Sequence, residues 1–204
     1  MIIFGKKKMM MTKKMNKEYW EERYISNEIG WDVGKITTPL KEYIDQIENK
    51  ALKILIPGAG IGHEFDYLIE KGFTNITVID IAEQPLESLK KRKPKHIKSF
   101  IQADFFDVDK TFDLVIEQTF FCALNPELRT KYVTQMHSLL KENGKLAGLF
   151  FDFPLTEVGP PFGGSEEEYL TLFSEKFKIR KLERAYNSIK PRKDRELFFI
   201  FEKK

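Results

Sequence analysis

One stretch of this sequence, residues 53–64, joins an apolar run to three glycines at alternate positions. After Lys53 the run I-L-I-P is branched and apolar, as is typical of a buried parallel strand, and Gly58, Gly60 and Gly62 follow it. From Phe65 onward the apolar residues have helical spacing. Glycine is needed where the main chain adopts unusual dihedral angles close to a ligand, and the amides that open a helix attract negative charge. The stretch therefore predicts a strand, a tight turn and a helix that together hold a nucleotide-like cofactor.

The spacing of the glycines discriminates between cofactors. A dinucleotide-binding turn of the form GxGxxG would need a glycine at position 63, where this chain has His63. The GxGxG spacing instead resembles the first motif of the class I methyltransferases that use S-adenosylmethionine. An apolar strand over residues 76–80 ends in Asp80, which we expect to accept hydrogen bonds from both ribose hydroxyls of the cofactor. A tight connection that binds no ligand is the alternative.

Composition limits the classes of protein to which the chain can belong. Its 204 residues, 42% of them hydrophobic, suit one domain, which we place at residues 16–204 after a disordered tail at residues 1–15. The net charge of +3, from 34 basic and 31 acidic residues, lacks the one-sided excess of a nucleic-acid binder. No apolar run approaches the length of a membrane helix, and the single cysteine, Cys122, excludes an internal disulfide. We expect a monomeric, cytoplasmic protein without nucleic-acid or membrane partners.

Both tryptophans lie before the first predicted core strand. Trp20, Tyr24 and Trp31 resemble the tryptophan-rich N-terminal lid of the thiopurine methyltransferase family, particularly its thiol and halide methyltransferase branch. In those relatives the three positions are generally tryptophans that touch S-adenosylmethionine, so Tyr24 departs from the pattern but remains aromatic. A sulfonium cation is attracted to the faces of aromatic rings. The resemblance implies that these residues bind the cofactor, and ordinary packing of an aromatic helix on the sheet is the alternative.

A two-residue motif follows a third predicted strand, over residues 97–102. Asp104 and Phe105 resemble the adenine-binding step of the same family, in which the carboxylate binds the exocyclic amine and the next residue covers the ring. The resemblance therefore assigns both residues to the cofactor. An acidic residue at the end of a strand can also cap a helix, which is the alternative for Asp104.

The fourth predicted strand, residues 112–117, leads into the sequence Q-T-F-F-C-A-L. The six residues after the glutamine closely resemble the family signature. Because strands one and four flank the crevice of such a sheet, we expect Gln118 to contact the cofactor, and Phe120 and Phe121 to face the transferred methyl group. Relatives of the thiol and halide branch carry a tyrosine where this chain has Gln118. We interpret Cys122 as a packed thiol because no histidine lies near it in the sequence.

The last third of the chain contains further candidate contacts to the substrate. The resemblance places the loop G-P-P-F, and with it Phe162, beside the substrate pocket. Arg192 and Arg195, in the last loop, could attract an anionic substrate, and exposed surface charge is the alternative. The remaining predicted elements are a helix and three strands, at residues 125–140, 145–151, 177–184 and 197–202. The last two strands should form the reversed hairpin that closes a seven-stranded methyltransferase sheet.

These features together predict a fold and an activity. The expected fold is a single-domain α/β Rossmann-like class I methyltransferase, with a seven-stranded, mostly parallel sheet, helices on both faces and an N-terminal helical lid. The resemblance implies that a methyl group passes from S-adenosylmethionine to a small, soft nucleophile: a thiol or thiopurine sulfur, bisulfide or a halide ion. In-line displacement by an anion requires alignment and exclusion of water but no obligatory catalytic residue. Three scattered histidines predict no metal site.

Three alternatives stay open at this point. A nicotinamide oxidoreductase would use the same strand, turn and helix, although the third glycine is missing. A methyltransferase that acts on another small molecule, RNA or protein would keep the cofactor site. A module that binds S-adenosylmethionine without turnover would carry the same binding residues.

Overall fold

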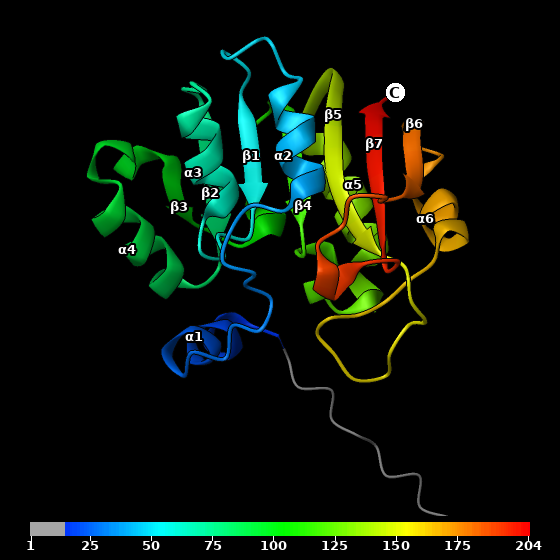
Figure 1. The fold of residues 1–204 in the computed structure, drawn as a ribbon, viewed down its shortest axis with the longest axis horizontal. Coiled ribbons are helices and arrows are strands. Elements are labelled where there is room, and N and C mark those ends of the chain that lie inside the picture. The colour runs from blue at the N-terminus through cyan, green and yellow to red at the C-terminus, as the bar shows by residue number, and fades with distance from the viewer. Residues whose placement is uncertain (1–14) are drawn as a thin grey trace, which may run out of the picture.

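The computed structural model describes residues 15–204, so most of the predicted disordered tail lies outside the described residues. One seven-stranded sheet has the order β3-β2-β1-β4-β5-β7-β6 (Figure 1). Neighbours among β1 to β5 pair in parallel, whereas β7 is antiparallel to both β5 and β6. The strands are β1 (Ile54–Pro57), β2 (Ile76–Asp80), β3 (Phe100–Gln102), β4 (Phe112–Gln118), β5 (Leu140–Phe151), β6 (Phe177–Arg184) and β7 (Glu196–Lys203). The predicted Rossmann-like sheet and its reversed hairpin are confirmed.

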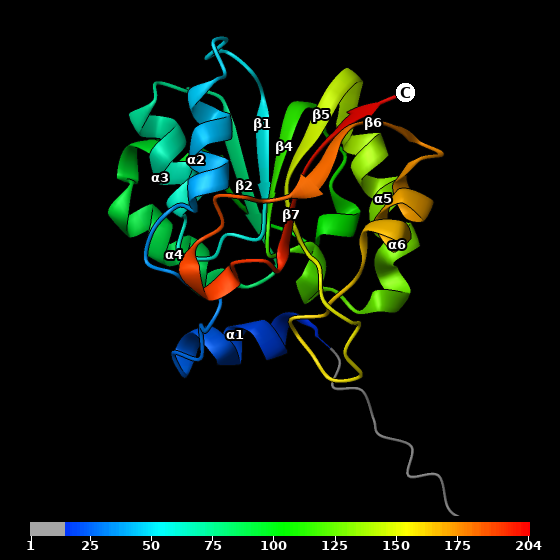
Figure 2. The same ribbon diagram turned by 45° about the vertical axis from the view of Figure 1, so that its right-hand side comes forward.

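Helices cover both faces of the sheet, and one helix lies beyond its edge. The apolar faces of α2, α3 and α4 pack on one side of the sheet, and those of α5 and α6 pack on the other (Figures 1 and 2). α1 lies below the edge at which β1 ends. The α-helices are α1 (Lys17–Ile25), α2 (Thr38–Asp45), α3 (His63–Glu70), α4 (Glu83–Arg92), α5 (Arg129–Leu139) and α6 (Glu166–Phe173). The 3₁₀ helices are η1 (Pro94–Ser99), η2 (Phe105–Asp107), η3 (Phe121–Ala123), η4 (Pro126–Leu128) and η5 (Lys190–Arg192).

β1 is the central strand and positions the glycine turn. All four of its residues are buried, and alternate side chains join opposite cores: Ile54 and Ile56 on one face, Leu55 on the other. Burial of each such aliphatic side chain stabilises the fold by about 1.5–3 kcal/mol. The strand is therefore a rigid support for the residues that follow it.

The sheet changes direction of winding at β1, which has β2 on one side and β4 on the other. Ile54 lies opposite both Ile76 and Leu114, but the pairing with β4 stops at Leu55, whereas the pairing with β2 continues to Pro57. β1 and β4 therefore separate toward their carboxyl ends. A crevice at such a switch point is the usual ligand site of an open α/β sheet.

Two predicted strand boundaries differ from the structure. Residues 97–99 belong to η1 instead of a strand, because β3 pairs with β2 only from Phe100, and Ile97 is 51% exposed. β5 begins at Leu140, where we predicted the end of a helix, because Leu140 pairs with Phe112 before an irregular stretch in which Asn143 adopts a φ of 59°. Periodicity alone did not reveal either boundary.

Candidate active site

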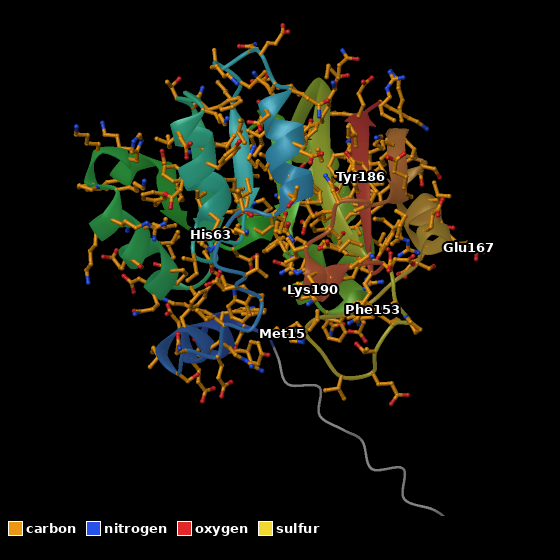
Figure 3. All side chains as sticks on the ribbon, in the orientation of Figure 1. Met15, His63, Phe153, Glu167, Tyr186 and Lys190 are labelled. Atoms are coloured by element: carbon orange, nitrogen blue, oxygen red, sulfur yellow. The ribbon has the colours of Figure 1, made fainter. Side chains whose placement is uncertain are left out.

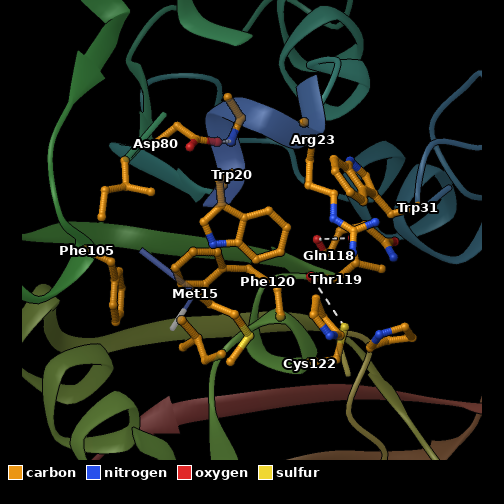
Figure 4. Close-up of a pocket in the computed structure, with 18 of the residues that line it drawn as sticks. Met15, Trp20, Arg23, Trp31, Asp80, Phe105, Gln118, Thr119, Phe120 and Cys122 are labelled. Atoms are coloured by element: carbon orange, nitrogen blue, oxygen red, sulfur yellow. Dashed lines mark hydrogen bonds between the residues drawn. The ribbon is translucent and has the colours of Figure 1, made fainter. Parts of the chain in front are cut away.

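A cavity of about 1130 Å³ opens at the carboxyl edge of the sheet (Figure 4). Its lining comes from α1 and the segment after it, the glycine turn, the ends of β2, β3 and β4, residues 160–161 and Arg192. Met15, His63 and Lys190, which are far apart in the sequence, lie toward this same edge in Figure 3. Met15, which we predicted to be in the tail, is part of the lining. The cavity is therefore assembled from most of the chain.

The three glycines of the turn have different roles. All adopt positive φ angles, 78° at Gly58, 51° at Gly60 and 85° at Gly62. A Cβ on Gly62 would approach Leu89 to 2.5 Å, and one on Gly58 would approach Phe120 to 2.9 Å, so these two glycines permit close packing. A Cβ on Gly60 would meet no atom within 4 Å, and Gly60 lines the cavity. Gly60 is thus where a ligand can approach the main chain.

Asp80 lies at the end of β2, where its carboxylate faces the cavity and also braces the surrounding loops. Its Oδ2 accepts the Ala59 N–H at 2.8 Å, and its Oδ1 accepts the Ala82 N–H at 2.8 Å. Burial raises the pKa of Asp80 to about 6, although these main-chain hydrogen bonds oppose the effect. Each oxygen keeps a further lone pair that can accept a hydrogen bond from a ligand.

The N-terminal aromatic residues form one group at the cavity. The Trp31 ring lies edge-on to that of Trp20, at 5.7 Å between centroids (Figure 4), and to that of Tyr24, at 5.5 Å. All three residues line the cavity. Burial, the nearby Asp80 carboxylate and other charges raise the pKa of Tyr24 well above its ordinary value, so it stays neutral. The structure thus brings together the three residues that the resemblance assigned to the cofactor.

Glu21 fixes α1 to the rest of the fold, and no local pattern around it predicts this role. Its carboxylate accepts the main-chain N–H groups of Glu83 and Gln84, in the first turn of α4. The residue before α4, Ala82, has no side chain that could cap the helix. Glu21 therefore supplies the missing N-terminal cap from another helix, and α1 is held beneath the sheet edge.

Buried Glu117 organises the turn that follows β4. Its Oε1 accepts the N–H groups of Phe120 and Phe121 at 2.8 and 2.9 Å, and its Oε2 accepts the Tyr132 hydroxyl at 2.7 Å. Burial raises the pKa of Glu117 to about 7, although these three hydrogen bonds stabilise the ionised carboxylate and lower the pKa. Within the turn Thr119 has a φ of 58°, a strained conformation for a β-branched residue. The carboxylate holds this strained turn in place.

Gln118 lines the cavity, as its predicted contact with the cofactor requires. Its Oε1 accepts the hydroxyl of Thr37 at 2.9 Å, while its Nε2 is buried without a partner among the described residues. Thr37, which links α2 to β4 in this way, is a second contact that sequence reasoning missed.

Asp104 and Phe105 both line the cavity. The Asp104 Oδ1 accepts the Phe106 N–H at 2.9 Å and caps η2, so the alternative role that we considered is present in the structure. Phe105 is buried against Phe120, at 5.2 Å between ring centroids. Because capping engages only one carboxylate oxygen, Asp104 keeps an acceptor for an adenine amine.

The cavity also contains charged groups. His63 Nε2 lies 2.8 Å from Asp32 Oδ1, which also accepts the Gly34 N–H. Burial opposes ionisation of Asp32, but the hydrogen bonds from Gly34 and His63 outweigh it, so the pKa of Asp32 is lowered. Arg192 lines the cavity and donates to the Trp31 carbonyl at 2.9 Å. Arg192 thus ties the last loop to the tryptophan segment.

Three predicted substrate contacts lie outside the lining. Phe121 is 2% exposed and packs against Tyr132 and the core behind the turn, and Phe162 is 7% exposed and packs on Gly159. Arg195 is exposed, with its guanidinium over the ring of Phe153 at 4.5 Å. Phe120, the fourth predicted contact, lines the cavity, as do Pro160, Pro161 and Arg192.

Cys122 is a packed thiol, as predicted. It is buried, its Sγ donates to the Thr119 carbonyl at 3.4 Å, and burial raises its pKa far above the ordinary value. Such a thiol is a poor nucleophile at neutral pH. Among residues 15–204 no cluster of histidine, cysteine and acidic side chains could hold a metal ion. None of the helices in this part of the chain is long and apolar enough to cross a membrane.

Comparisons with known proteins agree with this geometry. The chain is 29% identical over 157 residues to the probable thiol methyltransferase 2 of Arabidopsis thaliana, covering 74% of this chain and 69% of the relative. It is 29% identical over 185 residues to the thiocyanate methyltransferase 1 of Brassica oleracea, covering 87% of this chain and 81% of the relative. The fold resembles that of the Burkholderia thailandensis 1,6-didemethyltoxoflavin N1-methyltransferase, solved with bound 1,6-didemethyltoxoflavin and S-adenosylhomocysteine. The TM-score is 0.72 and the sequence identity 17%, over 92% of this chain and 86% of that one.

The sequence model of the family described as thiopurine S-methyltransferase matches residues 15–203. This match spans the Trp segment, the glycine turn, the Asp104-Phe105 step and the turn after β4, the same elements that line the cavity. The chain belongs to the thiopurine S-methyltransferase family.

Proposed function

We propose that this protein transfers a methyl group from S-adenosylmethionine to a small, soft, anionic sulfur nucleophile. One observation carries the proposal: a single cavity joins open glycine main chain at Gly60 and the carboxylate of Asp80 to the indole rings of Trp20 and Trp31. A sulfonium nucleoside needs all three environments, for its backbone approach, its ribose hydroxyls and its cation. Membership of the family supplies the reaction class.

The residues present fit this cofactor. Space above Gly60 admits the ligand, and the free lone pairs of Asp80 suit the ribose hydroxyls. Asp104 offers one unengaged carboxylate oxygen to the adenine amine, beside the ring of Phe105. The aromatic faces of Trp20 and Trp31 suit a sulfonium, at about 0.5–2 kcal/mol per contact.

The chemistry requires alignment more than proton transfer. S-adenosylmethionine, when bound, supplies an electrophilic methyl group on a positively charged sulfur. We expect the aromatic residues Trp20, Trp31 and Phe120 to shield the transferred methyl group from water, and the β4 turn fixes the position of Phe120. An anionic nucleophile needs no general base.

The walls of the cavity favour soft anions. The side chains of Phe120, Leu124, Pro160 and Pro161 line the cavity, are apolar and offer no hydrogen bonds to a hard, strongly hydrated anion. Thiolates, thiocyanate and bisulfide are polarizable and give up their hydration more easily than a hard oxyanion. One relative is named for a thiol and another for thiocyanate. Iodide is also polarizable and easily dehydrated, and it is the second candidate.

Purified protein with methyl-labelled S-adenosylmethionine tests the proposal. The substrates are thiocyanate, bisulfide, a thiophenol, 6-mercaptopurine and iodide, and the labelled methylated products are separated and counted. We expect methyl transfer to at least one sulfur anion, at a rate higher than that of controls without enzyme at the same pH. Transfer to iodide alone would favour the second candidate.

Three results would overturn the assignment. Binding of S-adenosylhomocysteine with no transfer to any of these nucleophiles would favour a binding module. Tight binding of a nicotinamide dinucleotide would return the oxidoreductase to consideration. Salt-dependent binding of RNA would favour a macromolecular substrate.

We further propose that residues 16–204 are one domain that acts as a monomer in the cytoplasm. Size-exclusion chromatography with light scattering and fractionation of cells measure these two properties.

A further inference from the structure

Glu64 is a carboxylate in the cavity that the fold itself does not use. It lies in the first turn of α3 and lines the cavity next to the glycine turn. Its neighbour His63 is paired with Asp32, but among residues 15–204 no other residue's side chain or main chain hydrogen-bonds to the Glu64 carboxylate. Burial raises its pKa, although its own main-chain N–H and the nearby His63 and Arg192 oppose this. Glu64 is half-buried and forms no ion pair among the described residues, and a partly desolvated, unpaired carboxylate is costly for the fold.

Arg192 is the complementary charge in the same cavity. Its side chain is nearly buried, and it is fixed by the Trp31 carbonyl at 2.9 Å, by Glu196 at 3.4 Å and by the ring of Phe151 at 5.7 Å. Glu196 also accepts the Ser188 hydroxyl at 2.8 Å, so its charge is shared. A guanidinium has five N–H donors, and these contacts engage only part of them. Arg192 can therefore receive an anionic group from the cavity without losing its anchors.

An acidic and a basic side chain that face one cavity match a ligand that carries both charges. The methionine end of S-adenosylmethionine has an α-ammonium and an α-carboxylate on one carbon. Asp32 is occupied by His63 and the Gly34 N–H, and Asp80 by two main-chain amides, which leaves Glu64 as the free anion near the glycine turn. We propose that Glu64 binds the α-ammonium of the cofactor and that Arg192 binds its α-carboxylate. The inference rests on the proposed function, because it assumes this cofactor.

Calorimetry with three nucleosides and four proteins tests each half separately. The ligands are S-adenosylhomocysteine, its deaminated analogue and its decarboxylated analogue. The proteins are the wild type, E64Q, R192Q and E127Q, where Glu127 is an exposed carboxylate that also lines the cavity and serves as the matched control. Circular dichroism and Trp fluorescence verify that each variant is folded.

We expect E64Q to bind S-adenosylhomocysteine about 10- to 100-fold more weakly than the wild type, as for loss of a charged hydrogen bond. Its affinity for the deaminated analogue should match that of the wild type, because that ligand has no ammonium. R192Q should lose affinity for S-adenosylhomocysteine but not for the decarboxylated analogue. E127Q should bind all three ligands as the wild type does.

Some outcomes would overturn this assignment. Wild-type affinity of E64Q for S-adenosylhomocysteine, or equal losses for the aminated and deaminated ligands, would exclude Glu64 as the ammonium site. Equal losses of R192Q for the carboxylated and decarboxylated ligands would mean that Arg192 only anchors Trp31. If the wild type binds none of the three nucleosides, the proposed function fails instead, and the two failures are thus distinguishable.

Discussion

Replacement of Glu117 by glutamine should change how the stability of this protein depends on pH. Glu117 is fully buried, and its two oxygens accept three hydrogen bonds, from the Phe120 and Phe121 N–H groups and the Tyr132 hydroxyl. Glutamine has nearly the same shape, keeps one carbonyl acceptor for the two amides and can donate its NH₂ to the Tyr132 oxygen. The substitution removes the ionisation while it leaves the packing of the turn intact.

The magnitude follows from the shifted pKa. Burial raises the pKa of Glu117 from its ordinary 4.5 to about 7, so the folded state binds this proton more tightly than the unfolded chain. Glu117 therefore costs no stability below pH 4.5, and the cost grows until both states are ionised above about pH 7. At about 1.4 kcal/mol per pKa unit the full cost is about 3 kcal/mol. About 2.5 kcal/mol of it should develop between about pH 5 and about pH 8.

Urea unfolding at a series of pH values, followed by Trp fluorescence, measures the effect. The free energy of unfolding of E117Q minus that of the wild type should increase by about 2.5 kcal/mol from about pH 5 to about pH 8, and the contributions of other groups cancel in this difference. Tyr132→Phe is the control: it removes a donor to the carboxylate, so the wild-type loss of stability should move to higher pH. If the free energies of unfolding of the wild type and E117Q change in parallel with pH, the reasoning is refuted.

Three further predictions concern the cavity. Asp80→Ala should weaken binding of S-adenosylhomocysteine by about 1–3 kcal/mol, since two hydroxyls lose their acceptor, and calorimetry that gives an unchanged Kd would exclude this placement. Trp20→Ala should weaken S-adenosylmethionine by about 0.5–2 kcal/mol more than S-adenosylhomocysteine, because only the former carries a sulfonium; equal losses would argue against a cation–π contact. Cys122→Ala should retain activity, and iodoacetamide should alkylate the folded wild type slowly near pH 7, because burial raises the pKa of this thiol; rapid alkylation would contradict its burial.

Local patterns in the sequence predicted the centre of this fold correctly. The buried strand β1, the glycine turn and the strand that ends in Asp80 are encoded within about thirty consecutive residues, so hydrophobic periodicity and turn chemistry identify them. The aromatic residues at 20, 24 and 31 are likewise close in sequence, and the structure places them together. Such features can be predicted because the residues that form them are close together in the sequence.

Features that depend on distant partners could not be predicted in this way. Glu21 caps α4 across 62 positions and Thr37 reaches Gln118 across 81, and a single sequence does not indicate such pairs. Arg192 and Arg195 are three residues apart in one loop, yet only the former turns into the cavity because it belongs to η5 and bonds to Trp31. Glu64 was missed although it directly follows the turn, because an acidic residue in the first turn of a helix has an ordinary role there.

The route of the chain explains why the tryptophan segment can close the cavity without a second domain. Arg192 donates to the Trp31 carbonyl across 161 positions, Glu21 holds α1 on α4, and Thr37 holds the following segment on β4. The N-terminal segment is thus attached at three points to the sheet edge instead of packing into a core of its own. A ligand that binds beneath it adds stability that grows with the logarithm of the ligand concentration and reaches about 2.7 kcal/mol at 100 times Kd. Because Tyr19 is the only buried residue of α1, we expect a bound cofactor to contribute substantially to holding this helix in place.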